Sequence, residues 1–551
     1  MSPRNSSLFF AIAFAAFAAC ARRAPPPPVA AAPVTEVPLF DDLGDHQHLV
    51  TTSSPLAQRY FDQGLRLVYA FNHDEAIRAF QQASELDPDC AMAHWGTALA
   101  LGPNINWPAD RERDRRAYQE IQRAIRLADR ATEPERAIIH ALAVRYADPP
   151  LADRMPLDVG YADAMREVMR RFPDDLDAAT LFAEALMDLR PWDYWTRDGR
   201  PQPGTLEMVE TLEEVIRRAP DHPGANHYYI HAIEASPHPE RGIPSAERLG
   251  NLMPGAGHVV HMAAHIYVRV GRYADASIAN ERAISVDESY LARTRPRGVY
   301  PMMYVPHNIH FLSATTGIEG RSRDCIRAAR ELARYATPEA VREMPMMEMF
   351  APTPLFALTR FGRWQQILAE PVPPQGQVFT MGIWHYARGM AFAATGRLDE
   401  AGQEQERLAG VAATLPPDVV IGQNPGGPLL AIAGHALQGD IAARRGRIDE
   451  SIGHHREAIR LEDELRYDEP PPWYQPVRQL LGLVLLTAGR PREAELVYRE
   501  DLRKNPENGW SLIGLAQSLR AQDAFVEASE VEMRFRRAWA NADVILPTSR
   551  F

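Results

Sequence analysis

The sequence predicts an all-α protein built as one continuous array of helical hairpins. Apolar residues recur at helical spacing along most of the 551 residues. Alternating runs of β-branched residues bounded by hairpin turns, which would predict strands, are missing from the sequence. A Gly-Arg pair followed by an acidic residue and a small residue recurs in GRYADA (271–276), GRLDEA (396–401) and GRIDES (446–451). A turn that returns in this way indicates an internal repeat, each unit of which is one hairpin.

Composition excludes several classes of function. Hydrophobic residues make up 46% and charged residues 24%, the balance of an ordinary globular protein. Three Cys are too few for a disulfide-rich scaffold or for a cysteine-rich zinc or iron–sulfur site. The net charge of −12 argues against a nucleic-acid partner. Lys504 is the sole lysine and no Gly-rich phosphate loop occurs, so no nucleotide cofactor is expected.

The N-terminus predicts export from a bacterial cell. Residues 1–20 contain an apolar run from Leu8 to Ala19, which suits a signal peptide and is shorter than the ~20 residues that span a bilayer. The run ends in Phe-Ala-Ala-Cys20, which resembles a lipoprotein cleavage box with Phe in place of the usual Leu. We therefore expect a lipid on Cys20, with ordinary cleavage at a nearby small residue as the alternative. Residues 21–50 form a Pro/Ala-rich tether and lead-in. The protein is thus expected in the cell envelope, in the periplasm or at the outer membrane, and on the membrane through its lipid anchor only.

The folded body is expected to begin at residue 51. An aromatic residue, a small residue, a large apolar residue, Ala, an aromatic residue, Ala and Pro follow one another at Tyr60, Gly64, Leu67, Ala76, Phe80, Ala83 and Pro88. This pattern resembles the tetratricopeptide repeat (TPR). The pattern returns in residues 478–506 with Gly482, Leu485, Gly489, Ala494, Tyr498 and Pro506. The resemblance implies a right-handed helical-hairpin solenoid, whose concave face holds a ligand such as a peptide or protein partner.

Pro/Gly-rich segments interrupt the array. Residues 412–427 and 464–473 are expected to separate a TPR-like array over 51–411 from C-terminal TPR-like repeats over 412–551, without making independent domains. Two aromatic loops, 102–108 and 189–204, come earlier in the chain. In the second of these, Trp192 is a candidate to roof the concave groove; capping of the superhelix is the alternative.

Histidines gather in one part of the array. Nine of the 18 His lie between residues 222 and 310. His227 and His231 stand four apart, and His258, His261 and His265 are spaced three and then four apart, so each set shares one helix face. His261 follows His227, and His265 follows His231, by 34 residues, the length of one TPR repeat. These pairs are therefore expected at equivalent places on neighbouring helices, facing inward, with Glu234 beside them.

The neighbouring hairpins extend this row. The same register places Glu184 inward on the preceding hairpin, and His307 and His310 share a face of the following one. Neutral imidazoles with carboxylates and no thiolate suit zinc, copper, iron, nickel or manganese. The sequence therefore predicts a transition-metal site whose candidate ligands are His227, His231, His258, His261, His265, His307, His310, Glu184 and Glu234.

Two functions are compatible with this predicted site. The first is an exported solenoid with a mononuclear or binuclear metal site that activates water or oxygen, with the catalytic residues undetermined. The alternative is a non-catalytic TPR scaffold that binds a peptide or protein partner at the envelope, and a metal carrier lies between the two. Inward histidines can also hydrogen-bond a peptide, carbohydrate or phosphate without any metal.

Overall fold

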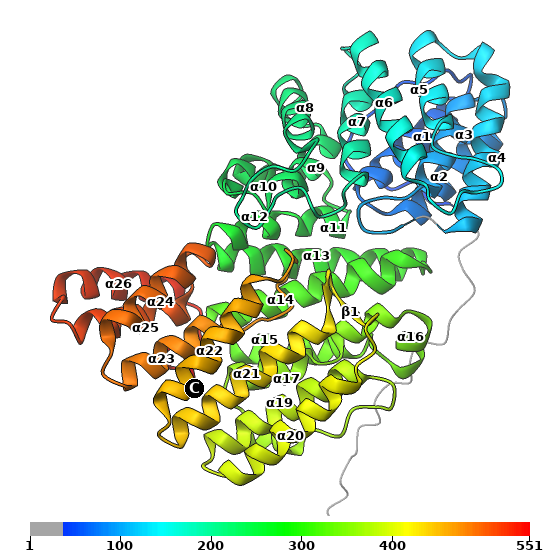
Figure 1. The fold of residues 1–551 in the computed structure, drawn as a ribbon. Helices are drawn as coiled ribbons and strands as arrows, with labels where there is room; N and C mark the ends of the chain where they lie inside the picture. Colours follow the sequence, from blue (N-terminus) through cyan, green and yellow to red (C-terminus); the bar gives the residue numbers. More distant parts are fainter. Residues whose placement is uncertain (1–36, 109) are drawn as a thin grey trace, which may run out of the picture.

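The computed structural model describes residues 37–108 and 110–551 (Figure 1). The predicted signal peptide, the lipidation site at Cys20 and most of the tether lie outside the described residues. No helix in the described part of the chain is both long and apolar enough to cross a membrane.

The chain is an all-α protein of stacked helical hairpins, as predicted. Its first part comprises α1 (Pro55–Tyr69), α2 (His73–Leu86), α3 (Ala91–Leu101), α4 (Arg111–Leu127), α5 (Glu133–Ala143), α6 (Met155–Arg171), α7 (Leu176–Asp188), α8 (Thr205–Arg218), α9 (Pro223–Ile233), α10 (Ile243–Leu252), α11 (Gly257–His261) and α12 (Ala263–Arg269). Short 3₁₀ turns, η1 (Ala128–Arg130) and η2 (Pro239–Gly242), lie between them.

A long helix, α13 (Tyr273–Thr294), crosses the middle of the molecule and leads into the second part (Figure 1). The π-helical turn η3 (Tyr300–Tyr304) and the 3₁₀ turn η4 (Pro345–Phe350) belong to this part. Its α-helices are α14 (Val305–Glu319), α15 (Ser322–Ala333), α16 (Pro338–Glu343), α17 (Thr353–Arg360), α18 (Trp364–Ala369), α19 (Val378–Ala394), α20 (Leu398–Thr414), α21 (Gly426–Arg444), α22 (Ile448–Asp463), α23 (Val477–Thr487), α24 (Pro491–Lys504), α25 (Gly509–Arg520) and α26 (Phe525–Ala538).

Small residues let the hairpins close, as the repeat pattern predicts. A Cβ atom added to Gly64 on α1 or to Gly96 on α3 would lie 2.6 Å or 2.5 Å from the ring of Phe80 on α2. Phe80 is fully buried, which stabilises the fold by about 2 to 3 kcal/mol. Tyr498 on α24 occupies the same place between Gly482 and Gly514. A methyl group at any of these glycines would push the paired helices apart.

The 412–427 segment contains the only strands among the described residues, apart from the isolated β-bridges Asn104–Trp107 and Trp195–Pro201. A two-residue strand, β1 (Val420–Ile421), pairs in antiparallel fashion with β2 (Asn424–Pro425). No strand is expected from the sequence, because this hairpin is too short to produce an alternating pattern. It carries Gly422, whose φ of 58° is in the left-handed region, at its turn.

The C-terminal helices pack back against the middle of the chain (Figure 1). The Trp510 indole of α25 donates a 3.1 Å hydrogen bond to the carbonyl of Gly317 on α14. Asp543, beyond α26, accepts hydrogen bonds from the backbone N–H groups of Ser322 and Arg323. This return brings the segment between α22 and α23 next to the His-rich helices.

Candidate metal centre

Two neighbouring repeats supply five of the histidines. His227 and His231 lie on α9, while His258 and His261 lie on α11 and His265 on α12. The His231 and His265 rings, one repeat apart in sequence, have centroids 5.3 Å apart. The structure therefore confirms that the 34-residue offset stacks these positions. All five side chains are almost completely buried, so they lie inside the protein and not on an open groove wall.

The next hairpin adds His307. It stands at the start of α14, directly after the π-helical turn η3, and its ring lies 4.8 Å from that of His261. A π-turn inserts an extra residue into the helical rise and changes the direction of the side chains that follow, and such turns are frequent at functional sites.

The six rings form two triads. The first triad is His227, His231 and His258, and the second triad is His261, His265 and His307; within each, one nitrogen per ring lies within 4.8 Å of the others. The triads are adjacent, because the His258 and His261 ring centroids are 5.8 Å apart. Each triad has the donor number of a metal site that keeps a position open.

Hydrogen bonds determine which nitrogen of four rings faces its triad. Nδ1 of His231 and Nδ1 of His265 lie 2.8 Å and 2.6 Å from the two carboxylate oxygens of Glu234. Nδ1 of His227 lies 2.6 Å from the carbonyl oxygen of Tyr69. Each of these partners is an acceptor, so Nδ1 carries the proton and Nε2 keeps a free lone pair. Carboxylate–histidine contacts of this kind orient metal ligands in many proteins.

The His261 ring is oriented in the same way, by a hydrogen bond from its Nδ1 to a side-chain amide. Its Nδ1 lies 2.7 Å from Oδ1 of Asn280, whose Nδ2 donates to the carbonyl of Ala276. Nε2 of His261 then faces Nε2 of His265 at 2.8 Å. Two lone pairs at this distance repel each other unless a proton or a cation lies between them.

On His261 this proton is disfavoured by the surroundings. Burial, and after it the nearby His265 and His307 rings, lower the pKa of His261 well below its usual value. Burial and neighbouring imidazoles also hold the pKa of His227, His258 and His307 far below 6.5. Neutral imidazoles are the form that binds metal. The Nε2 atoms of His227 and His231 and both nitrogens of His258 have no hydrogen-bond partner among the described residues.

Glu234 is the shared support of both triads. Burial alone would raise its pKa, but the proximity of His265 and the hydrogen bonds from both rings hold that pKa well below the usual range. The Tyr467 hydroxyl donates to Glu234 Oε2 at 3.0 Å and lies 2.7 Å from Glu469 Oε1. Glu234 was predicted beside the histidines and is there, although it contacts their Nδ1 atoms and not the side that faces the triads.

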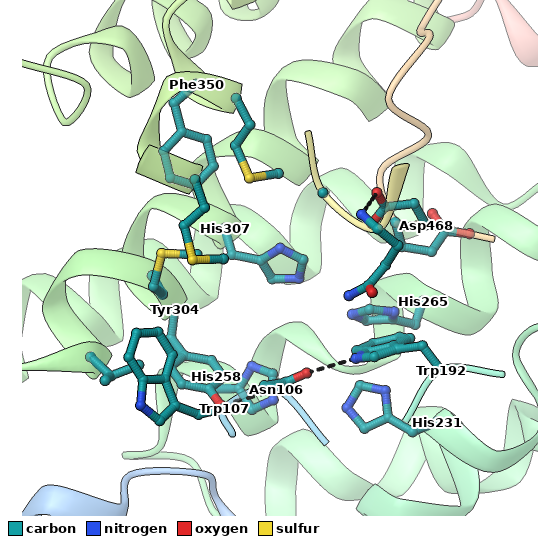
Figure 2. Close-up of a pocket in the computed structure, with 17 residues that line it drawn as sticks. Asn106, Trp107, Trp192, His231, His258, His265, Tyr304, His307, Phe350 and Asp468 are labelled. Carbon is teal, nitrogen blue, oxygen red and sulfur yellow. Dashed lines mark hydrogen bonds between the residues drawn. The ribbon is translucent and has the colours of Figure 1, made fainter. Parts of the chain in front are cut away.

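A cavity of about 120 Å³ opens onto four of the six histidines, His231, His258, His265 and His307 (Figure 2). Both aromatic loops contribute to its wall, and Trp192, the candidate to roof the groove, is among the lining residues. The Trp192 indole donates to Asn106 Oδ1 at 3.1 Å and meets the His231 ring edge-on. The lining residues are Asn106, Trp107, Trp192, His231, His258, His265, Val299, Met303, Tyr304, His307, Met346, Met349, Phe350, Gly422, Gln423, Asp468 and Glu469.

Both Pro/Gly-rich segments reach this cavity. The β1–β2 hairpin brings Gly422 and Gln423, and the segment before α23 brings Asp468 and Glu469. Burial raises the pKa of each of these two carboxyl groups to about 7, with the charge of Glu234 adding to the shift of Glu469. These residues were not predicted from the sequence to be part of the site. An acidic pair directly before three prolines was the available signal.

Two predicted ligands lie apart from the triads. His310 contacts the Tyr474 hydroxyl through Nε2 and packs edge-on against Phe350. Glu184 on α7 is buried near Asp188 and Arg145, where burial and the charge of Asp188 raise its pKa. Neither residue belongs to the groups of closely spaced donor atoms found among the described residues.

A second His-rich cluster surrounds Asp177 on α7. Oδ1 of Asp177 accepts from Nε2 of His46 at 2.9 Å and from the Tyr69 hydroxyl at 2.5 Å. Oδ2 lies 2.9 Å from Nδ1 of His48. Burial would lower the pKa of His48, but its hydrogen bond to Asp177 and that carboxylate's charge raise the pKa to about 9.

His222 completes this cluster as a hydrogen-bond donor. Its Nδ1 accepts from the backbone N–H of Ala225 at 3.1 Å, so its Nε2 carries the proton and points to Asp177 at 3.2 Å. Oδ1 of Asp177 thus accepts from His46, Tyr69 and His222, and Oδ2 accepts from His48. We interpret the cluster as an ion-pair network that holds the lead-in segment against α7.

Cys90 and Cys325 belong to none of the groups of closely spaced donor atoms found among the described residues. Cys90 and Cys325 are free and buried, and burial raises the pKa of their thiols to about 11 and about 12. A thiol with so high a pKa is a poor nucleophile at neutral pH.

Fold and site together define an α-helical hairpin repeat protein that resembles TPR solenoids and has a buried cluster of histidines able to hold metal. No family model matches the chain, and no curated protein matches it in sequence. Among solved structures, the human IFIT1 dimer with m7Gppp-AAAA is 14% identical over 89% of this chain and 91% of that chain, with a TM-score of 0.34. The yeast Tom70 crystal structure is 12% identical over 87% of this chain and 90% of that chain, with a TM-score of 0.28.

Proposed function

We propose that this protein binds two transition-metal ions, one in each histidine triad. The observation that carries the proposal is the set of Nε2 lone pairs of His227, His231, His261 and His265, which their Nδ1 hydrogen bonds turn toward the triads. A buried lone pair without a partner is costly, and a bound cation removes that cost. Because the triads are adjacent, the two ions form a binuclear centre.

The donor set favours copper among zinc, copper, iron and manganese. Each triad consists of imidazoles alone, and Glu234 lies behind the rings, whereas manganese prefers carboxylate ligands. Imidazole suits copper, zinc and iron alike. The thioethers of Met303, Met346 and Met349 on the cavity wall favour Cu(I), which soft sulfur ligands select. A bound pair of Cu(I) ions would supply the electrons for oxygen chemistry, so the proposed activity is that of an oxidoreductase.

The residues of the chain would prepare this chemistry in two ways. Glu234 fixes the orientation of one ring from each triad. The cavity gives a substrate access to His231, His258, His265 and His307, and its aromatic walls keep bulk water away from them.

Metal analysis of protein purified without a His tag tests this proposal. After anaerobic loading with Cu(I) we expect about two equivalents of copper per chain, and competition with Zn²⁺ should leave copper in place. Less than about 0.2 equivalents of any transition metal after supplementation would reject the metal centre. Preferential retention of zinc would assign the site to metal-assisted hydrolysis instead.

A non-catalytic scaffold is the second candidate. TPR-like folds commonly bind protein partners, and the predicted concave face would take a peptide. The burial of the triad residues counts against it, because a peptide in an open groove would contact exposed side chains. Full copper occupancy combined with no turnover of any oxidisable substrate would favour a metal carrier or scaffold.

We also propose that the protein is exported and anchored through a lipid on Cys20. The apolar run before Cys20 and the Pro/Ala-rich residues after it support this proposal. Changing Cys20 to Ser should move the protein from the membrane fraction to the soluble fraction. An unchanged distribution would favour ordinary cleavage or another means of membrane attachment.

A further inference from the structure

The cavity beside the triads has the size of one aromatic ring. Its volume is about 120 Å³. An apolar cavity of about 150 Å³ holds a benzene molecule in other proteins, so this one admits a single ring with a small substituent. Anything as large as a peptide would require the walls to move.

The walls match an aromatic occupant. Trp107, Tyr304 and Phe350 present rings to the cavity, and Met303 and Met349 add polarisable thioethers (Figure 2). Aromatic and sulfur–aromatic contacts each add roughly 0.5 to 1.5 kcal/mol beyond the burial of apolar area. Flat, polarisable molecules are therefore preferred over aliphatic ones of equal size.

The polar part of the lining selects against anions. It contains Asn106, Gln423, Asp468 and Glu469 together with the four histidines, and no Lys or Arg of the described residues lines the cavity. The carboxyl groups of Asp468 and Glu469 would repel a carboxylate or phosphate on a ligand and can exchange hydrogen bonds with a hydroxyl. A charged anion brought here would lose its hydration without gaining a cationic partner.

From this lining we infer that the cavity binds a neutral single-ring aromatic compound with a hydroxyl group, of which phenol is the simplest. The inference rests on the proposed function only in naming this molecule as the substrate of the metal centre. The binding itself depends on the cavity and is measured on metal-free protein.

Calorimetric titration of the metal-free protein with phenol and with benzoate tests the inference. We expect phenol to bind at one site per chain and benzoate to bind at least about tenfold more weakly. Equal affinities, or tighter binding of benzoate, would overturn the inference, as would the absence of phenol binding.

Variants locate the binding site. Val299→Phe places a ring in the cavity and should weaken phenol binding at least about tenfold, whereas the same change at the exposed Val372 should leave the affinity unchanged. Should Val299→Phe misfold, Gln423→Trp serves instead, because Gln423 lines the cavity from an exposed hairpin. Undiminished phenol affinity in the folded cavity variants would place the binding elsewhere and reject the inference.

The two proposals fail separately. Phenol binding without metal uptake would reject the metal centre and keep the cavity assignment. Two equivalents of metal without phenol binding would reject the cavity assignment and keep the metal centre.

Discussion

Changing His231 and His265 together to Ala is expected to reduce copper from about two equivalents to below about 0.2 per chain. His231 belongs to the first triad and His265 to the second, so the double variant leaves each triad with two donors. Two imidazoles hold a metal far more weakly than three. Elemental analysis after gel filtration measures the result.

A matched control removes two histidines elsewhere. His435 and His454 face each other through Nδ1 at 3.1 Å on α21 and α22, outside both triads. Their change to Ala should leave the metal content unchanged. If the His231/His265 variant kept full occupancy, the triads would not be the metal site. The single His227→Ala variant should retain one equivalent, which separates a binuclear from a mononuclear centre.

Changing Glu234 to Ala is expected to weaken metal binding about 10- to 100-fold, although all six triad histidines remain unchanged. The variant removes the acceptor of the Nδ1 protons of His231 and His265 and also of the Tyr467 hydroxyl. Both rings lose their fixed orientation and tautomer, and buried donors are left without partners. Competition with a copper chelator of known affinity measures the change.

Glu240 provides the control for Glu234. Its carboxylate lies 3.2 Å from Nδ1 of His238, and both side chains are exposed. Glu240→Ala should therefore leave copper affinity at the wild-type value. An affinity unchanged by Glu234→Ala would show that the triads bind without this support. It would also remove the reason to assign the Nε2 lone pairs of His231 and His265 to metal.

The histidine row illustrates how far the repeat pattern extends into function. Because each repeat adds the same rise and rotation, residues 34 apart occupy equivalent places, and His231 and His265 do meet across neighbouring helices. The same reasoning placed Glu184 on this row, but the structure places it near Arg145 and Asp188. Periodicity predicts which face a residue takes and does not predict which of several polar neighbours it meets.

The sequence by itself determined the all-α repeat architecture. It also grouped five of the six triad histidines on neighbouring helices, because helical spacing and repeat length are local properties of the chain. His307 joined that prediction through its own i, i+3 pair with His310, and only one of the two entered a triad. The division into two triads depends on hydrogen bonds to Tyr69, Glu234 and Asn280, which no spacing rule contains. The cavity wall likewise depends on the C-terminal repeats folding back, which brings residue 468 to residue 265. Such contacts join segments far apart in sequence, so only the tertiary structure decided them.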